Sequence, residues 1–172
     1  MVMWKGVVAT VASDKLAALV NSFGSSLISV GRDVGFEVTL NKSQVSQGVK
    51  VDNVCVASLV GLVGGGVQGT AVIMLDDGGF SGAVTAMSGG MIKPNNDDPI
   101  AMSVVGELSN MVCGRALIQS ALNGVDVTPP QILAGSNIKN VPSHSPGVKC
   151  FTLPFSIQPS GTIYLVLALV AS

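Results

Sequence analysis

The sequence has few charged residues, few aromatic residues and a single histidine. This composition limits the classes of function that the protein can have. Of its 172 residues only 11% are charged and 4% are aromatic, and a single histidine, His144, is present. The formal net charge is −1, and no run of Lys or Arg forms the basic stripe that nucleic-acid-binding proteins use. We therefore expect no nucleic-acid partner.

Cysteine is also scarce. Cys55, Cys113 and Cys150 are widely spaced, and no two of them form a Cys-x-x-Cys pair. An odd number of separated cysteines fits reduced thiols in the cytoplasm better than disulfides or a zinc site. We therefore expect a cytoplasmic protein without a zinc site.

Long hydrophobic runs are missing as well. The longest uncharged apolar run, Ile163 to Ala171, falls far short of the ~20 residues that a spanning helix needs, and it is typical of a buried strand. The apolar stretch near the N-terminus is too short for a good signal peptide. We expect no membrane span and no secretion.

What the chain does have is apolar content. Hydrophobic residues make up 48% of it, and its mean hydropathy is +0.58. The length fits a single domain over residues 1–172, with 1–12 as an N-terminal segment. A chain with so little charge either packs tightly or buries surface in an oligomer, which favours a homodimer. A sheet edge or the apolar strand around Leu165 to Leu169 could provide the contact.

Hydrophobic spacing predicts an α+β fold with a mainly antiparallel sheet flanked by two long helices. The two long helices are expected from Ser13-Asp14 to Val30 and over 97–123, with a short helix over 80–87 between them. Expected strands cover 36–40, 54–62, 68–75, 148–157 and 162–170, and the proline-containing stretch 125–134 is expected at an edge.

Glycine-rich and acidic stretches could suggest binding sites, but structural roles fit them better. A strand, not a helix, follows Gly64-Gly65-Gly66, so this is a hairpin turn rather than a phosphate-binding loop. Adjacent carboxylates at Asp76-Asp77 and Asp97-Asp98 do not face each other, and helix capping is their expected role.

The histidine and one cysteine are further candidates for chemistry. His144 lies in a Pro-Ser-His-Ser-Pro loop without an acidic or nucleophilic neighbour in sequence, so a catalytic triad would need tertiary contacts. Cys113 follows Asn110 by three residues, and packing is its expected role.

The long helix over 97–123 carries the most informative pattern. At ~100° per residue, Glu107 and Asn110 project from the same side, with Ser103 and Gly114 on the same arc. The opposite arc is an apolar stripe that is expected to face the core: Ala101, Val105, Leu108, Val112 and Ala116.

The stretch Val-Gly-Glu-Leu-Ser-Asn-Met at 105–111, followed by Gly114, resembles the signature helix of the CheC/CheX/FliY family of chemotaxis phosphatases. The order of elements from about Leu16 to Val170 is also similar. That resemblance implies the family's fold, a homodimer, and dephosphorylation of a CheY-type response regulator in the cytoplasm.

The resemblance also implies roles for individual residues. Asn110 would orient a water in line with the phosphoryl group, and Glu107 would pair with the receiver's active-site lysine. Ser103, Met111 and Gly114 would contact the partner. The receiver would supply the Mg²⁺ and the phosphorylated aspartate, so this chain needs neither a metal nor a nucleophile.

The sequence leaves two points to decide. CheC-type members carry two Glu-x-x-Asn helices, whereas here Ala18 stands three residues before Asn21, so one pair is present, as in the CheX type. A non-catalytic adaptor that docks on a receiver or a flagellar-switch component is the alternative function. The presence of Asn110 favours the enzyme, because a pure adaptor need not keep it.

Overall fold

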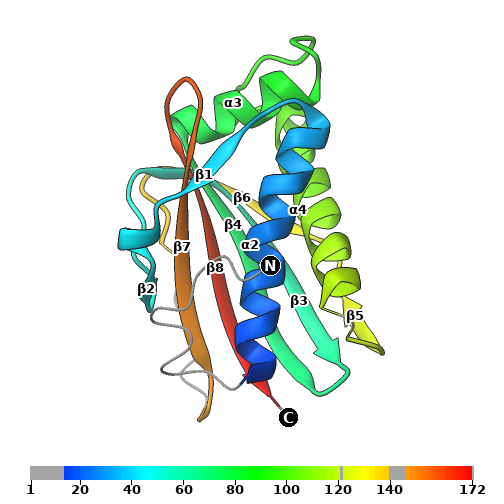
Figure 1. Ribbon diagram of the computed structural model, residues 1–172. Coiled ribbons are helices and arrows are strands. Elements are labelled where there is room, and N and C mark those ends of the chain that lie inside the picture. Colours follow the sequence, from blue (N-terminus) through cyan, green and yellow to red (C-terminus); the bar gives the residue numbers. More distant parts are fainter. Residues whose placement is uncertain (1–13, 121, 140–145, 172) are drawn as a thin grey trace.

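The computed structural model describes residues 14–120, 122–139 and 146–171, and these form helices on one side of a sheet (Figure 1). The helices are α2 (Asp14–Val34), α3 (Asp77–Met87) and α4 (Pro99–Gln119), with a short 3-10 helix over Lys42–Gln44. The strands are β1 (Val38–Leu40), β2 (Ser46–Gln47), β3 (Val54–Gly64), β4 (Val67–Asp76), β5 (Val125–Val127), β6 (Gln131–Ala134), β7 (Lys149–Ile157) and β8 (Thr162–Ala171).

All strands belong to one 8-stranded sheet in the order β1-β7-β8-β4-β3-β5, with β2 also on β7 and β6 also on β3. Every strand pair is antiparallel. The two long helices, α2 and α4, each have 21 residues and lie side by side across one face, while α3 crosses one end (Figure 1). The predicted α+β fold, with a mainly antiparallel sheet and two long helices, is confirmed.

Glycine makes the central hairpin possible. Gly64, Gly65 and Gly66 all have positive φ, at 101°, 59° and 80°, which residues with a Cβ rarely adopt. The turn sends β4 back along β3 from Val67↔Gly64 onward. The expected hairpin is confirmed, and its strands form the middle of the sheet.

The main core lies between the sheet and the helices. Strand residues of alternate parity and the inner stripes of α2 and α4 fill it. Its largest fully buried side chains include Phe23, Phe151, Phe155, Leu27, Leu108 and Leu153. A second, smaller apolar cluster around Val72, Met74 and Val166 covers part of the opposite sheet face.

Strand β8 corrects one expectation about the dimer. The apolar residues Leu165, Leu167 and Leu169 looked able to bury surface against a second copy. They are fully buried in the monomer, because β8 lies between β7 and β4 with its leucines under the helices. These three leucines therefore cannot make a subunit contact, and the sheet edges stay as the other place expected for one.

Two aspartates cap helices, as the sequence predicted. Asp98 is the N-cap of α4, and its carboxylate accepts a hydrogen bond from the Ile100 amide at 3.0 Å. Asp76 caps α3 by accepting from Gly79 N at 2.8 Å, and the same oxygen accepts from Thr162 N at 2.8 Å. Asp76 thus ties the start of α3 to the start of β8.

The first strand begins later than expected, at Val38 instead of Phe36. The amides of Gly35 and Phe36 both donate to the Gly31 carbonyl, which closes the end of α2. Gly35 has φ +108°, so the chain reverses there before the strand can start.

The signature helix also ends earlier than expected, at Gln119 instead of near Asn123. Continuing the helix would place Leu122 roughly 60° from Glu107, toward solvent. The chain leaves the helix after Ser120, and Leu122 packs against the core. The end of the helix thus coincides with a change of direction that brings Leu122 to the core.

Some expectations fall on residues that the structure does not describe. The capping role of Ser13, the N-terminal segment 1–12 and the loop histidine His144 lie outside the described ranges. Within those ranges, no helix combines the length and the apolar character needed to cross a membrane.

The two faces of α4 should respond differently to mutation. Val105→Asp places a charge at a position with 0% exposure, and we expect it to lower the free energy of unfolding by about 4 kcal/mol. Glu107→Ala lies on the exposed face and should change stability by no more than about 0.5 kcal/mol. Urea unfolding followed by circular dichroism measures both, and the reverse order would contradict the assigned faces.

Candidate functional site

The site predicted from the sequence lies on the solvent face of α4. Every member of the predicted inner stripe is buried, from Ala101 to Ala116, with exposures of 0 or 1%. On the opposite side Ser103, Glu107, Asn110 and Gly114 are all exposed. Helical geometry therefore brings these four predicted residues onto one outward-facing strip, and Met111 at its margin is half-buried.

The two most informative side chains have no partner within the described chain. Neither the Glu107 side chain nor the Asn110 side chain makes a hydrogen bond or ion pair with another described residue. A carboxylate and a carboxamide one turn apart are thus presented outward with their hydrogen-bonding groups unused. In a helix of 21 residues, Glu107 and Arg115 are the only charged side chains.

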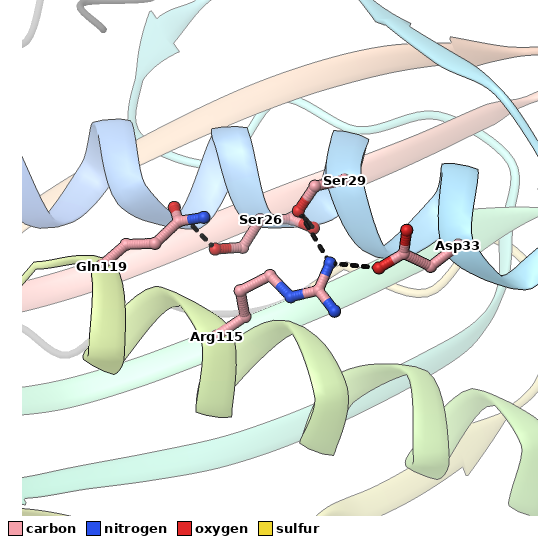
Figure 2. Close-up of polar contacts among 5 residues, drawn as sticks. All are labelled: Ser26, Ser29, Asp33, Arg115 and Gln119. Carbon is pink, nitrogen blue, oxygen red and sulfur yellow. Dashed lines mark hydrogen bonds and ion pairs between the residues drawn. The ribbon is translucent and has the colours of Figure 1, made fainter.

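Arg115 is occupied elsewhere. Its Nη1 donates to Asp33 Oδ2 at 2.7 Å and to Ser29 Oγ at 3.0 Å, both on α2, and Ser26 Oγ donates to Gln119 Oε1 at 3.3 Å (Figure 2). These contacts join the antiparallel helices α2 and α4. The only cation of α4 points toward α2, so Glu107 is left as the one unpaired charge of the strip.

The side chains of Ser103 and Met111 make contacts within the protein, which limit how they can bind a partner. The Ser103 hydroxyl donates to the Ile100 carbonyl at 2.6 Å, one turn back, so its oxygen can only accept from a partner. Met111 packs partly against the main core. Any contact that Met111 makes with a partner would use the part of the side chain that is still exposed.

Two glycines of α4 differ in whether the surrounding structure leaves room for a side chain. A Cβ on Gly106 would lie 2.9 Å from Ile132 Cδ1, so its absence lets β6 pack closely against the helix. A Cβ on Gly114 would have no atom within 4 Å. Glycine in a helix interior costs roughly 0.5–1 kcal/mol relative to alanine. Nothing in the described chain requires that cost at Gly114.

The sequence reasoning missed two residues on this face. Ile100 is 63% exposed and Ile118 is 82% exposed, among the largest exposures of apolar side chains in the described chain. They lie seven residues before and eleven residues after Glu107, within roughly 20° of it around the helix. Their spacing could have revealed them, but isoleucine on a helix is usually assigned to the core.

Helix α2 lacks an equivalent site. Its buried residues Leu16, Val20, Phe23, Leu27 and Gly31 have the same spacing as the inner stripe of α4. Placing residue 16 on residue 101 puts Ser22 and Ser25 where α4 has Glu107 and Asn110. Two serines offer no carboxylate and no carboxamide. The structure thus supports one site rather than two, in a different register from the comparison at Ala18 and Asn21.

No other chemistry is assembled nearby. Among the described residues, no group of three or more His, Cys, Asp or Glu could hold a metal ion. Cys113 is buried on the inner side of α4, and burial raises the pKa of its thiol to about 12. A thiol that stays protonated at neutral pH is not a nucleophile. The expectation that Cys113 serves packing agrees with this environment.

Two surface hollows of the described chain lie away from this strip. One is lined by residues of α3 and the β7–β8 turn, among them Ser81, Thr85 and Pro159. Another lies beside β2 and includes Lys50 and Tyr164. Neither includes a residue of α4. A strip of exposed side chains along a helix suits a macromolecular partner better than a small ligand, which concave pockets usually bind.

Comparisons with known proteins identify similar chains. The family model described as "Chemotaxis phosphatase CheX" matches residues 56–156. A curated protein of Thermotoga maritima, "CheY-P phosphatase CheX", is 32% identical over 128 residues, which is 72% of this chain and 79% of that protein.

Solved structures are similar over most of their length. A CheC-like superfamily protein from Shewanella sp. PV-4 is 26% identical with a TM-score of 0.70, covering 88% of this chain and 97% of that one. The chemotaxis protein CheX from Vibrio vulnificus is 25% identical with a TM-score of 0.70, covering 88% and 98%.

The buried thiols give a test of the packing role assigned to Cys113. At pH 7.5 we expect Cys113 and Cys55 to remain unmodified by a thiol reagent in the folded protein, because burial raises the pKa of each to about 12. All three cysteines should react after unfolding in guanidinium. Mass spectrometry of the labelled peptides measures this. Rapid labelling of Cys113 in the folded state, accompanied by loss of activity, would contradict its packing role.

Proposed function

Because the chain belongs to the family of the chemotaxis phosphatase CheX, we propose that it hydrolyses the phospho-aspartate of a CheY-type response regulator. The relative from Thermotoga maritima carries this activity in its name. The observation that carries the proposal for this chain is the strip on α4. There Glu107 and Asn110 are exposed, adjacent and without partners in the described chain.

Asn110 is the proposed catalytic residue. Its carboxamide would accept a hydrogen bond from a water and donate one toward the phosphoryl oxygens, which holds the water in line with the phosphorus. The water oxygen bonds to phosphorus as the bond from phosphorus to the aspartyl oxygen breaks. Inorganic phosphate leaves, and the receiver's carboxylate is restored.

A neutral carboxamide suits this position. The transferring phosphoryl group and its aspartate are negatively charged, so a carboxylate at the same place would repel them. Phosphoryl transfer depends mainly on positioning and electrostatic stabilisation rather than on a covalent intermediate with the catalyst. The receiver would bring its own Mg²⁺, and this chain would add no cofactor.

Glu107 is proposed to hold the receiver in register. As the one unpaired charge of α4, it would pair with the active-site lysine of the receiver, one turn from Asn110. Ser103 and Gly114, on either side of the pair, and the exposed part of Met111 would complete the contact. The three free cysteines of the described chain support a cytoplasmic place of action.

We also propose that the protein is a homodimer, joined through the sheet edge that β5 and β6 form on β3. Three exposed apolar side chains support this edge: Val63 at 56%, Val127 at 42% and Leu133 at 51%. They lie on neighbouring strands, because Val63 is opposite Asp126 and Leu133 is opposite Ala57. The edge would add strands or bury its apolar rim against a second copy.

The dimer prediction is tested at Leu133. Light scattering of the wild type at micromolar concentration should give twice the chain mass, and Leu133→Asp should shift the protein to the monomer. Thr39→Asp, at an exposed position in β1 on the other edge, is the control and should remain dimeric. A monomeric wild type would contradict the proposal, and a dimer that survives Leu133→Asp but not Thr39→Asp would move it to the other edge.

Asn110 provides the test of the mechanism. Asn110→Ala should lower the accelerated rate of receiver dephosphorylation by about 10²–10³, the usual effect of removing one preorganised hydrogen-bonding group. Binding to a receiver loaded with BeF₃⁻ and Mg²⁺ should remain within a few-fold. Asn110→Asp keeps the size but adds a negative charge, and it should be no better than alanine. Single-turnover decay of the phosphorylated receiver measures these rates.

The same experiment separates the enzyme from the adaptor. If wild-type protein binds the loaded receiver but the phosphoryl group decays at the receiver's intrinsic rate, the protein is a docking module. If Asn110→Ala keeps full activity, the protein is a phosphatase by another mechanism. Val105→Ala provides the matched control for a change inside α4 that leaves the strip intact.

A further inference from the structure

The exposed face of α4 continues beyond the residues that the chemistry uses. Gly114 and Ile118 follow Asn110 by one and two turns on the same side, and both are exposed. Ile118 is 82% exposed at the last turn of the helix. This end of the strip differs from the rest of α4 in two ways. It has a highly exposed apolar side chain, and it has a glycine that no contact within the described chain requires.

We propose that Gly114 and Ile118 form a second contact for the receiver domain: Gly114 permits a close approach, and Ile118 is an apolar anchor that fixes the receiver's position relative to Asn110. This proposal rests on the proposed function. It requires that the partner has an apolar patch about 12 Å from its phosphorylated aspartate. That distance follows from the separation of eight residues along the helix between Asn110 and Ile118.

Gly114 supports a close approach by another molecule. A Cβ there would meet no atom of this chain within 4 Å, whereas Gly106 has a packing reason in Ile132. Its position in a regular helix gives no conformational reason either, because Gly114 is not among the residues with positive φ. Alanine would make a more stable helix. The remaining role for the missing side chain is to leave room for a partner.

The size of a receiver domain indicates that the receiver itself covers Gly114 and Ile118. A specific interface takes about 800 Å² from each protein, and a domain of about 100 residues has a radius of gyration near 13 Å. A receiver whose active site lies on Asn110 must therefore also cover the next two turns of α4. A second copy of this chain on Ile118 would compete with the receiver for the same space.

The absence of charge supports an apolar contact. Beyond Glu107 the only charged side chain of α4 is Arg115, and it is held by Asp33 on α2 (Figure 2). Arg115 is 33% exposed, but its charge is paired with Asp33, so the outward positions Gly114 and Ile118 add no unpaired charge that a partner would have to desolvate. Removing the isoleucine surface from water would make a favourable contribution to the free energy of binding.

The first test is Ile118→Ser, with kinetics under multiple turnover. We expect the KM for a phosphorylated CheY-type receiver from the same genome to rise about tenfold or more, while kcat stays within twofold, because the anchor is far from the reacting atoms. The control is Met91→Ser. Met91 is 88% exposed, and it lies in the connection between α3 and α4, before the start of α4. Its substitution should change neither constant.

The second test is Gly114→Ala, where stability and function should move in opposite directions. The melting temperature should rise by about 2–4 °C, because alanine is the better helix former. The affinity for the receiver loaded with BeF₃⁻ and Mg²⁺ should fall by about tenfold. A structural role for Gly114 would instead lower the melting temperature and affinity together.

The outcomes separate this proposal from the proposed function. Titration with the BeF₃⁻-loaded receiver tests docking even if the wild type does not accelerate dephosphorylation. Unchanged affinity in both Ile118→Ser and Gly114→Ala overturns the anchor, whatever Asn110→Ala shows. A change in oligomeric state by Ile118→Ser with an unchanged KM also overturns it, because Ile118 would then contact a second copy of this chain.

Discussion

The burial of one side of α4 against the sheet is the constraint on which the site depends. Ala101, Val105 and Leu108 are buried completely, and a helix that buries these positions must turn Glu107 and Asn110 outward. The site therefore needs no loop and no pocket to hold its residues. Its geometry is as rigid as the packing of a 21-residue helix on the sheet, which suits a catalyst that acts by positioning.

Helix α2 holds the one cation of α4. Arg115 lies eight residues from Glu107, about 12 Å along the helix axis, and Asp33 and Ser29 hold its guanidinium against α2. A partly exposed ion pair adds little stability. Glu107, the other charged residue of α4, has no side-chain partner in the described chain, so its carboxylate is available to a cation of the proposed partner.

Most local features of the chain were predictable from sequence, and long-range ones were not. The spacing along α4 predicted which residues are buried, and the glycines at 64–66 predicted the central hairpin, because helical periodicity and positive φ are local constraints. The later start of β1 is a local effect that the spacing missed, because the amides of Gly35 and Phe36 donate to the Gly31 carbonyl. The early end of α4 is different, because Leu122 leaves the helix and packs against residues that are distant in sequence. The Arg115–Asp33 pair joins residues that no spacing connects. Ile118 was missed because an apolar residue is assigned to the core unless the structure exposes it.

The central claim is that the outer strip of α4 lies on the receiver's active site with Asn110 at the phosphoryl group. A crystal structure of this protein with a CheY-type receiver loaded with BeF₃⁻ and Mg²⁺ tests it most directly. The account predicts that the Asn110 carboxamide lies within hydrogen-bond reach, about 3 Å, of a water in line with the beryllium. A complex in which the receiver binds another face and Asn110 points into solvent would contradict it.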